Sequence, residues 1–313
     1  MTHDRRLWPG YVPPQRDELF TSWLMRICRS HEYKSHSFSK FYFGGLPIWN
    51  RDLDRDGPSV LKELICSYTF LTPQSVDNLF LKSYEGSIIS RVVSNGPSRV
   101  ILPLGIRHRK RNLYGQMFCP GCLDNDLPYY RKSWRMAFNL MCVSCGFYLW
   151  DRCPKCQNAI AFHRLENGLK NSFLKRSLSE CYYCQFDLRY AGLLVKSKDL
   201  IDYQKRIDEY CDSSFEDTNP SNLPEHYLKL LTLLTQPRGG TNRFQEVFLA
   251  QNLLKSYKIN AYSNLQVRQE ILPQINKHLG SIEALKEFLV NNDIGKSCLS
   301  SVFYDDMEFY SKL

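Results

Sequence analysis

The chain has 313 residues, 43% of them hydrophobic, which is enough for two or three domains with a real core. Its formal net charge of +9 at pH 7 suits a polyanionic partner, and no apolar run reaches the about 18 residues of a membrane span. The N-terminus also lacks the apolar stretch of a secretory signal, so we expect a cytoplasmic protein with no membrane partner. In a reducing compartment, paired cysteines indicate metal or redox chemistry rather than disulfides.

The N-terminal residues predict an extended arm that leads into a helix. Prolines interrupt residues 7–14, so no regular element is expected there. Residues 17–28 place their apolar side chains on one face of a helix, and we expect Asp17 to cap its start. These apolar side chains are Leu19, Phe20, Trp23, Leu24 and Ile27.

Two further short helices are expected over residues 61–68 and 73–81. Thr72 is the predicted cap of the second, with Pro73 at its first helical position. Two short helices joined by a tight turn are typical of a helix-turn-helix, although any small helical domain also produces such pairs. We therefore predict a helix-turn-helix-like domain over residues 1–100.

A strongly basic stretch follows. Residues 99–135 contain eight Lys or Arg and only two Asp, and aromatic side chains are interleaved with the basic ones. This pattern suits contact with nucleic-acid phosphates combined with stacking, and a solvated charged face is the alternative. Trp134 and Phe138 share one helical face, and we expect them to pack over a small core.

Eight of the twelve cysteines form four Cys-x-x-Cys pairs. Each pair presents two thiolates from one tight turn, and two pairs complete a tetrahedral zinc site. Nineteen residues separate the first two pairs, as in a zinc ribbon, and twenty-four separate the last two. We expect two structural zinc ions in a tandem zinc-ribbon domain over residues 101–195. The predicted ligands are Cys119, Cys122, Cys142, Cys145, Cys153, Cys156, Cys181 and Cys184.

Alternatives to this arrangement stay open. The pairs could interleave, with the first pair joining the third and the second joining the fourth. His108 or His163 could replace a thiolate, although surface histidines are the simpler interpretation. A redox role expects one Cys-x-x-Cys beside a βαβ pattern, and a catalytic zinc usually has His or carboxylate ligands. Neither feature is present.

The C-terminal part changes character. Residues 209–224 are polar and acidic with prolines, and we expect a linker or long loop over residues 196–224. Residues 225–313 predict a C-terminal helical domain, with helices over 225–234, 243–257 and 282–290. The expected fold class is mainly α with small zinc-ribbon β elements. The chain has no Gly-x-Ser-x-Gly, His-Glu-x-x-His or Walker motif, so we expect no enzyme.

Two stretches carry a resemblance to a known family. Residues 13–26 read Pro-Pro-Gln-Arg-Asp-Glu-Leu-Phe-Thr-Ser-Trp-Leu-Met-Arg, and residues 118–156 contain Cys-Pro-Gly-Cys-Leu, Tyr-Tyr-Arg, Trp-Arg and Asp-Arg-Cys-Pro-Lys-Cys. Both resemble the TniQ/TnsD family of transposon target-selection proteins. The family usually has His where this chain has Cys145, and a thiolate can replace an imidazole at structural zinc. The resemblance covers residues 5–190, and the last hundred residues match only in being helical.

The resemblance implies helix-turn-helix elements joined to zinc ribbons and a role in DNA transposition. Such proteins engage target DNA or a DNA-bound targeting complex, and they recruit an AAA+ ATPase that brings the transposase. It implies contacts to double-stranded DNA by Arg107, Arg109, Lys110, Arg111, Arg131, Lys132 and Arg135. It implies contacts to the ATPase by Trp8, Pro9, Tyr11, Arg16, Trp23 and Arg26.

A second function stays open: an autonomous, sequence-specific, zinc-dependent DNA-binding protein that reads an attachment site or regulates transcription. Longer relatives read a site themselves, and the length of this chain favours the adaptor. An RNA-guided effector complex and a second copy of the chain are further candidate partners. The expected location is a prokaryotic cytoplasm, in association with the nucleoid.

Overall fold

The computed structural model divides the chain into two compact units, Met1–Leu194 and Val195–Leu313. It describes residues 7–89, 91–94, 100–104, 113–166, 168–169 and 173–216, and five helical positions between 265 and 273. The boundary expected near residue 100 does not separate the units, because the N-terminal helices and all eight paired cysteines lie in the first. Residues 198–216, expected in a linker, form α6 (Lys198–Glu216). The helices expected beyond residue 224 lie outside the described residues.

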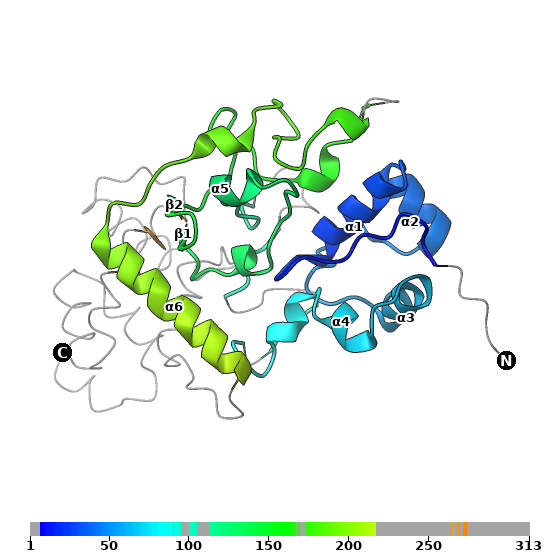
Figure 1. Cartoon of the computed structure of the whole chain (residues 1–313), viewed down its shortest axis with the longest axis horizontal. Helices are drawn as coiled ribbons and strands as arrows, with labels where there is room; N and C mark the ends of the chain where they lie inside the picture. The colour runs from blue at the N-terminus through cyan, green and yellow to red at the C-terminus, as the bar shows by residue number, and fades with distance from the viewer. Residues whose placement is uncertain are drawn as a thin grey trace, which may run out of the picture. The chain divides into compact units, whose positions relative to one another are not determined.

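Four helices build the N-terminal part of the first unit (Figure 1). They are α1 (Phe20–Ser30), α2 (Ser35–Phe43), α3 (Ser59–Tyr68) and α4 (Pro73–Asp77). α1 packs against α2, and α3 packs against α4. Thr72 caps α4 as predicted, because its hydroxyl accepts the amide of Ser75 at 3.2 Å. The helix-turn-helix itself stays a prediction.

Helix α1 starts later than the sequence predicted. Leu19 is its N-cap, and no side chain caps it. Asp17 instead adopts a left-handed backbone with φ 59°, and its carboxylate accepts the hydroxyl of Tyr84 at 2.6 Å and the amide of Ser133 at 3.2 Å. The prediction of Asp17 as a cap was therefore wrong, and the residue joins the arm to the basic stretch.

The arm is fixed to the helices by buried aromatic rings. Trp8 is 2% exposed and stacks on Tyr68, with centroids 5.6 Å apart and ring planes at 14°. Its amide donates to the carbonyl of Tyr68 at 2.9 Å. Trp23 of α1 is also buried, and its indole N–H donates to the carbonyl of Val12 at 2.9 Å. Trp8 thus anchors the arm in the core of the first unit.

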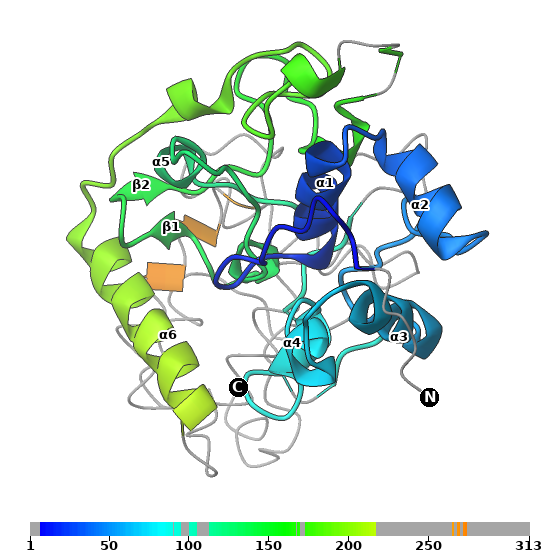
Figure 2. The same ribbon diagram turned by 45° about the vertical axis from the view of Figure 1, so that its right-hand side comes forward.

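The cysteine-rich part contains little regular structure. α5 (Pro120–Leu123) begins directly after Cys119, and β1 (Met141–Cys142) pairs antiparallel with β2 (Phe147–Tyr148) beside it (Figure 2). Short 3-10 turns lie between these elements, at Ser133–Arg135, Phe162–Arg164, Phe173–Lys175 and Leu188–Ala191, and a further one, Leu81–Tyr84, follows α4. The fold is rich in helices with few strands, as predicted. Within the described residues, no helix is both long and apolar enough to cross a membrane.

Candidate metal centres and nucleic-acid surface

The eight paired cysteines form two clusters of four thiols. The first contains Cys119, Cys122, Cys142 and Cys145, and the second contains Cys153, Cys156, Cys181 and Cys184. Within each cluster the sulfur atoms all lie within 4.8 Å of one another. The pairs therefore combine in sequence order, and the interleaved alternative does not hold.

The spacing of the sulfur atoms fits zinc. Cys122 Sγ lies 3.6 Å from the sulfur atoms of both Cys142 and Cys145. In the second cluster the separations are 3.6 Å for Cys153–Cys184 and 3.7 Å for Cys156–Cys181. Four thiolates held at about 2.3 Å from a tetrahedral zinc ion lie about 3.8 Å apart. Each cluster could hold one ion with no open position, as a structural site does.

Three of the four Cys-x-x-Cys turns share one backbone arrangement. The carbonyl of the first cysteine accepts the amide of the residue four positions later, and that residue has a left-handed backbone. The pairs are Cys142 with Gly146 (2.8 Å, φ 71°), Cys153 with Gln157 (2.9 Å, φ 60°) and Cys181 with Gln185 (3.0 Å, φ 62°). The turn at Cys119 instead continues into α5. This shared turn directs both thiols of a pair to the same side.

Gly121 marks where two turns of the first cluster approach each other. A Cβ atom at this position would lie 2.9 Å from the Cβ of Cys145 and 3.0 Å from its Sγ. Real Cβ contacts are longer than this, so only glycine fits without a shift of the Cys145 turn. The cysteine spacing predicted the metal ligands, whereas the need for this glycine was missed.

Polar groups beside the clusters favour thiolates. The side-chain amide of Asn158 donates to Cys156 Sγ at 3.4 Å. Burial raises the pKa of Cys156, but this hydrogen bond and others outweigh it and lower the pKa to about 7. Near the first cluster, burial lowers the pKa of Arg131, but the negative charges of Cys122, Tyr129, Cys142 and Asp17 together raise it more, so the net shift is upward. A zinc ion with four thiolates carries two negative charges, and Arg131 offsets part of them.

Two of the predicted DNA contacts are buried. Arg135 has no exposed surface, and it donates to both carboxylate oxygens of Asp52 at 3.0 and 2.7 Å and to the carbonyl of Leu102 at 2.8 Å. Lys132 is 6% exposed, and its ammonium donates to Ser83 Oγ at 2.9 Å and to a backbone carbonyl. Both cations are bonded inside the protein, which corrects their prediction as phosphate contacts.

The other predicted DNA contacts are placed differently. Arg131 is half-buried, with its guanidinium 5.8 Å from the ring centroid of Tyr129 and 5.7 Å from that of Trp134. Trp134 and Phe138 are buried, in agreement with their predicted packing. Arg107, Arg109, Lys110 and Arg111 lie outside the described residues. Their flanks, Leu104 and Leu113, both line one cavity.

Some of the predicted ATPase contacts are buried and others are exposed. Trp8 and Trp23 belong to the core, so they cannot meet a partner in this conformation. Arg26 donates to the carbonyl of Pro13 at 2.9 Å and to Glu18 at 3.0 Å, so it holds the arm on α1. Pro9 and Arg16 are exposed, and Tyr11 is half-buried with its ring 6.4 Å from that of the 72% exposed Phe70.

A buried ionic network was not predicted from the sequence. Asp54 accepts the amide and the hydroxyl of Thr21 at 2.8 and 2.7 Å, and Arg135 lies 3.9 Å away. Asp52 binds both Arg135 and Arg55. Burial raises the pKa of Asp54 to about 6. Residues 51–56 read Arg-Asp-Leu-Asp-Arg-Asp, which looks like a solvated loop and gives no local signal of burial.

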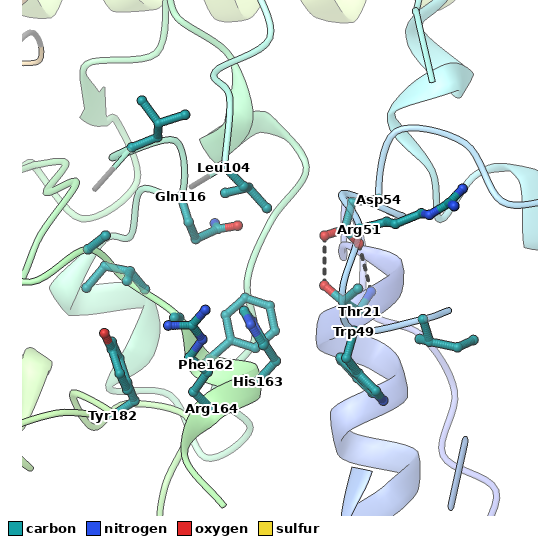
Figure 3. A pocket seen from close by; sticks show the side chains of 15 residues that line it. Thr21, Trp49, Arg51, Asp54, Leu104, Gln116, Phe162, His163, Arg164 and Tyr182 are labelled. Atoms are coloured by element: carbon teal, nitrogen blue, oxygen red, sulfur yellow. Dashed lines mark hydrogen bonds between the residues drawn. The ribbon is translucent and has the colours of Figure 1, made fainter. Parts of the chain in front are cut away.

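Two hollows adjoin on the first unit. A cavity of about 60 Å³ has two walls, with Gln116, Phe162, His163, Arg164 and Tyr182 on one side and Thr21, Trp49 and Asp54 on the other (Figure 3). A groove of about 520 Å³ is lined by α2 and the loop after it, from His36 to Asn50. Ile48 and Trp49 line both hollows.

Comparison with known proteins gives one match. The family model described as TniQ matches residues 9–148. This range includes the arm from residue 9, the four N-terminal helices and the first cysteine cluster, whereas the second cluster lies beyond it. No curated protein and no solved structure matches the chain. Residues 9–148, which are 140 of the 313 residues, are therefore similar to the TniQ family and form a TniQ domain.

Proposed function

We propose that the chain is a non-catalytic adaptor in DNA transposition. It engages target DNA or a DNA-bound targeting complex, and it recruits an AAA+ ATPase that brings the transposase. The TniQ match over residues 9–148 carries this proposal, because it associates this domain with transposition. The role of zinc in this proposal is structural. Each ion would crosslink two turns of a loop-rich region whose own hydrophobic core is small.

The DNA-binding surface of the proposal is centred on Arg107, Arg109, Lys110 and Arg111. The two ends of this segment, Leu104 and Leu113, line a cavity whose rim also carries Arg51 and Arg164. Neither of these two guanidiniums has a carboxylate partner among the described residues. A group of unpaired cations around one site attracts phosphates and makes binding depend strongly on salt.

The ATPase-binding surface of the proposal is the exposed side of the arm. Pro9 and Arg16 are exposed, and Tyr11 lies next to the exposed ring of Phe70 on the loop after α3. Exposed aromatic side chains beside an arginine are typical of the centre of protein interfaces. Because Trp8 and Trp23 anchor the arm in the core, this surface is held in one conformation without a partner.

Two experiments on the zinc-loaded full chain test the proposal. The first selects bound fragments from a fragmented host genome at near-physiological salt. The second captures AAA+ ATPases from the host and identifies them by mass spectrometry. Weak binding to all fragments that falls as salt rises, together with capture of an ATPase, supports the adaptor. Enrichment of one site that survives added salt, without ATPase capture, would replace it with an autonomous site reader.

A matched pair of variants identifies the DNA-binding surface. Replacing Arg107, Arg109 and Arg111 by Gln should reduce the slope of log affinity against log salt by about 0.9 for each phosphate that is no longer neutralised. Lys205→Gln removes a charge from an exposed position of α6 and should leave duplex binding nearly unchanged. Equal duplex affinities for the triple variant and the wild type would exclude this segment.

A further inference from the structure

The groove and the cavity share Ile48 and Trp49 in their walls, and we call the two hollows together the Trp49 groove. No carboxylate lines the larger part, whose described lining includes the exposed Lys40 and His36. The smaller part contains one carboxylate, Asp54, which is 2% exposed and has its two oxygens occupied by Thr21.

The free charge of the Trp49 groove is positive. Asp52 and Asp54 are balanced inside the protein by Arg55 and Arg135, with separations of 2.7 to 3.9 Å between the ionic atoms. Lys40, Arg51 and Arg164 remain, and none of them has a carboxylate partner among the residues that the structure describes. The groove therefore complements an anionic ligand.

Aromatic rings line the cavity at and around Trp49. The indole N–H of Trp49 donates to Ser39 Oγ at 2.9 Å, which fixes the ring. The ring of His163 is nearly parallel to it, at 15° with centroids 6.3 Å apart. Burial lowers the pKa of His163 to about 3, so this imidazole is a neutral ring at pH 7. Tyr182 lies 5.8 Å from the guanidinium of Arg164 at the far side.

The volumes of the two hollows limit which anionic ligands can fit. The larger hollow, at about 520 Å³, falls within the range of about 300–1,000 Å³ for sites that hold a small molecule, and so has room for a nucleotide. The smaller hollow, at about 60 Å³, holds only a group the size of a phosphate or the edge of a base. The bases of a duplex are stacked inside it, whereas unpaired bases can turn out and stack on aromatic side chains.

We propose that the Trp49 groove binds one unpaired nucleic-acid strand, DNA or RNA, with its phosphates on Lys40, Arg51 and Arg164 and a base against Trp49. This inference rests on the proposed function, because it assigns a further nucleic-acid contact to the same adaptor and shares Arg51 and Arg164 with the proposed DNA-binding surface. The strand could come from opened target DNA or from an RNA, and both present the same phosphates and bases.

Fluorescence anisotropy of the zinc-loaded full chain with labelled oligonucleotides of one sequence tests it. The probes are single-stranded DNA, single-stranded RNA and the DNA duplex. The double variant Lys40→Gln/Arg164→Gln should bind the preferred single strand about tenfold more weakly, with the salt slope reduced by about 0.7 for each phosphate that is no longer neutralised. Lys205→Gln is the matched control and should bind like the wild type. The single-strand probe that binds with the higher affinity identifies whether the strand is DNA or RNA.

A second measurement does not depend on variants. A strand carrying 5-iodouracil, irradiated in the complex, should crosslink to the peptides that contain Trp49 or Tyr182. Wild-type affinity of the double variant for single strands, or crosslinks confined to other peptides, would overturn the inference. The duplex probe and ATPase capture are measured on the same variants. Loss of duplex binding and ATPase capture with single-strand binding intact would contradict the proposed function alone. Loss of single-strand binding with the other two intact would contradict this inference alone.

Discussion

Arg135 and Asp52 form a two-pronged ion pair in the interior, with Nη1–Oδ1 at 3.0 Å and Nη2–Oδ2 at 2.7 Å. Arg135 belongs to the cysteine-rich part of the TniQ domain, and Asp52 belongs to the loop after α2, 83 residues earlier. Arg135 also donates to the carbonyl of Leu102. One side chain thus joins three segments of the first unit, and Arg135 acts as a structural residue.

Removal of this guanidinium should destabilise the fold. Arg135→Met leaves Asp52, whose side chain is 14% exposed, with only Arg55 as a partner, and breaking a largely buried pair in this way costs about 3 kcal/mol of unfolding free energy. Denaturant unfolding followed by circular dichroism measures the change. Arg189→Met is the control, because Arg189 is exposed and pairs with Asp187 at the surface, so its unfolding free energy should stay near the wild-type value. Equal effects of the two substitutions would contradict a structural role for Arg135.

The pH dependence of stability should carry the signature of Asp54. Its pKa is raised by burial from 3.8 to about 6 in the folded protein, so the folded state holds a proton that the unfolded state has released. The contribution of Asp54 to the unfolding free energy is therefore fully present below about pH 4, and it is lost as the pH rises through about 6. The shift corresponds to roughly 3 kcal/mol.

Asp54→Asn isolates this contribution. Its carboxamide oxygen can still accept the amide of Thr21, but it does not titrate in this range. The difference in unfolding free energy between wild type and variant, measured from pH 4 to 7, should move in favour of the variant as pH rises. Taking the difference cancels the acid sensitivity that both proteins share through their cysteine clusters. A difference that does not change with pH would show that Asp54 is not perturbed.

Sequence patterns over a few tens of residues could predict the helices and metal clusters whose stabilising contacts lie within the same stretch of chain. α3, the Thr72 cap and the sequential cysteine clusters follow from helical spacing, capping chemistry and ligand spacing within a few tens of residues. α2 has no such signal. The amide and hydroxyl of its Ser35 donate to Glu166, which lies 131 residues away in the chain. A helix that depends on a distant carboxylate cannot be predicted from its own residues.

The same reason explains the mixed outcome for the basic stretch. Residues 129–135, Tyr-Tyr-Arg-Lys-Ser-Trp-Arg, have the composition of a nucleic-acid contact. Burial of Lys132 and Arg135 depends on acceptors at Ser83 and Asp52, far earlier in the chain. Composition shows which side chains carry charge, and only the tertiary fold shows which of those charges are already bonded.

Gly121 should not tolerate a larger side chain. In Gly121→Ala the new Cβ would meet Cys145 at 2.9–3.0 Å, and such overpacking typically costs about 1–3 kcal/mol. The variant should also bind its first metal ion more weakly, which competition with a chromogenic chelator measures. Gly45→Ala is the control, since a Cβ there meets nothing within 4 Å and its φ is not positive. That substitution should be neutral or stabilising by up to about 1 kcal/mol.

Metal removal should unfold the cysteine-rich part of the first unit. The intact chain should contain two zinc ions by elemental analysis, and cobalt substitution should give the sulfur-to-metal absorption bands of four-thiolate sites. Cys119→Ser removes a buried ligand of the first cluster and should retain one ion and lose the cooperative thermal transition of this part. Cys66→Ser lies outside both clusters and should retain two ions. A Cys119→Ser protein that stays folded with two bound ions would show that the first cluster is not a structural zinc site.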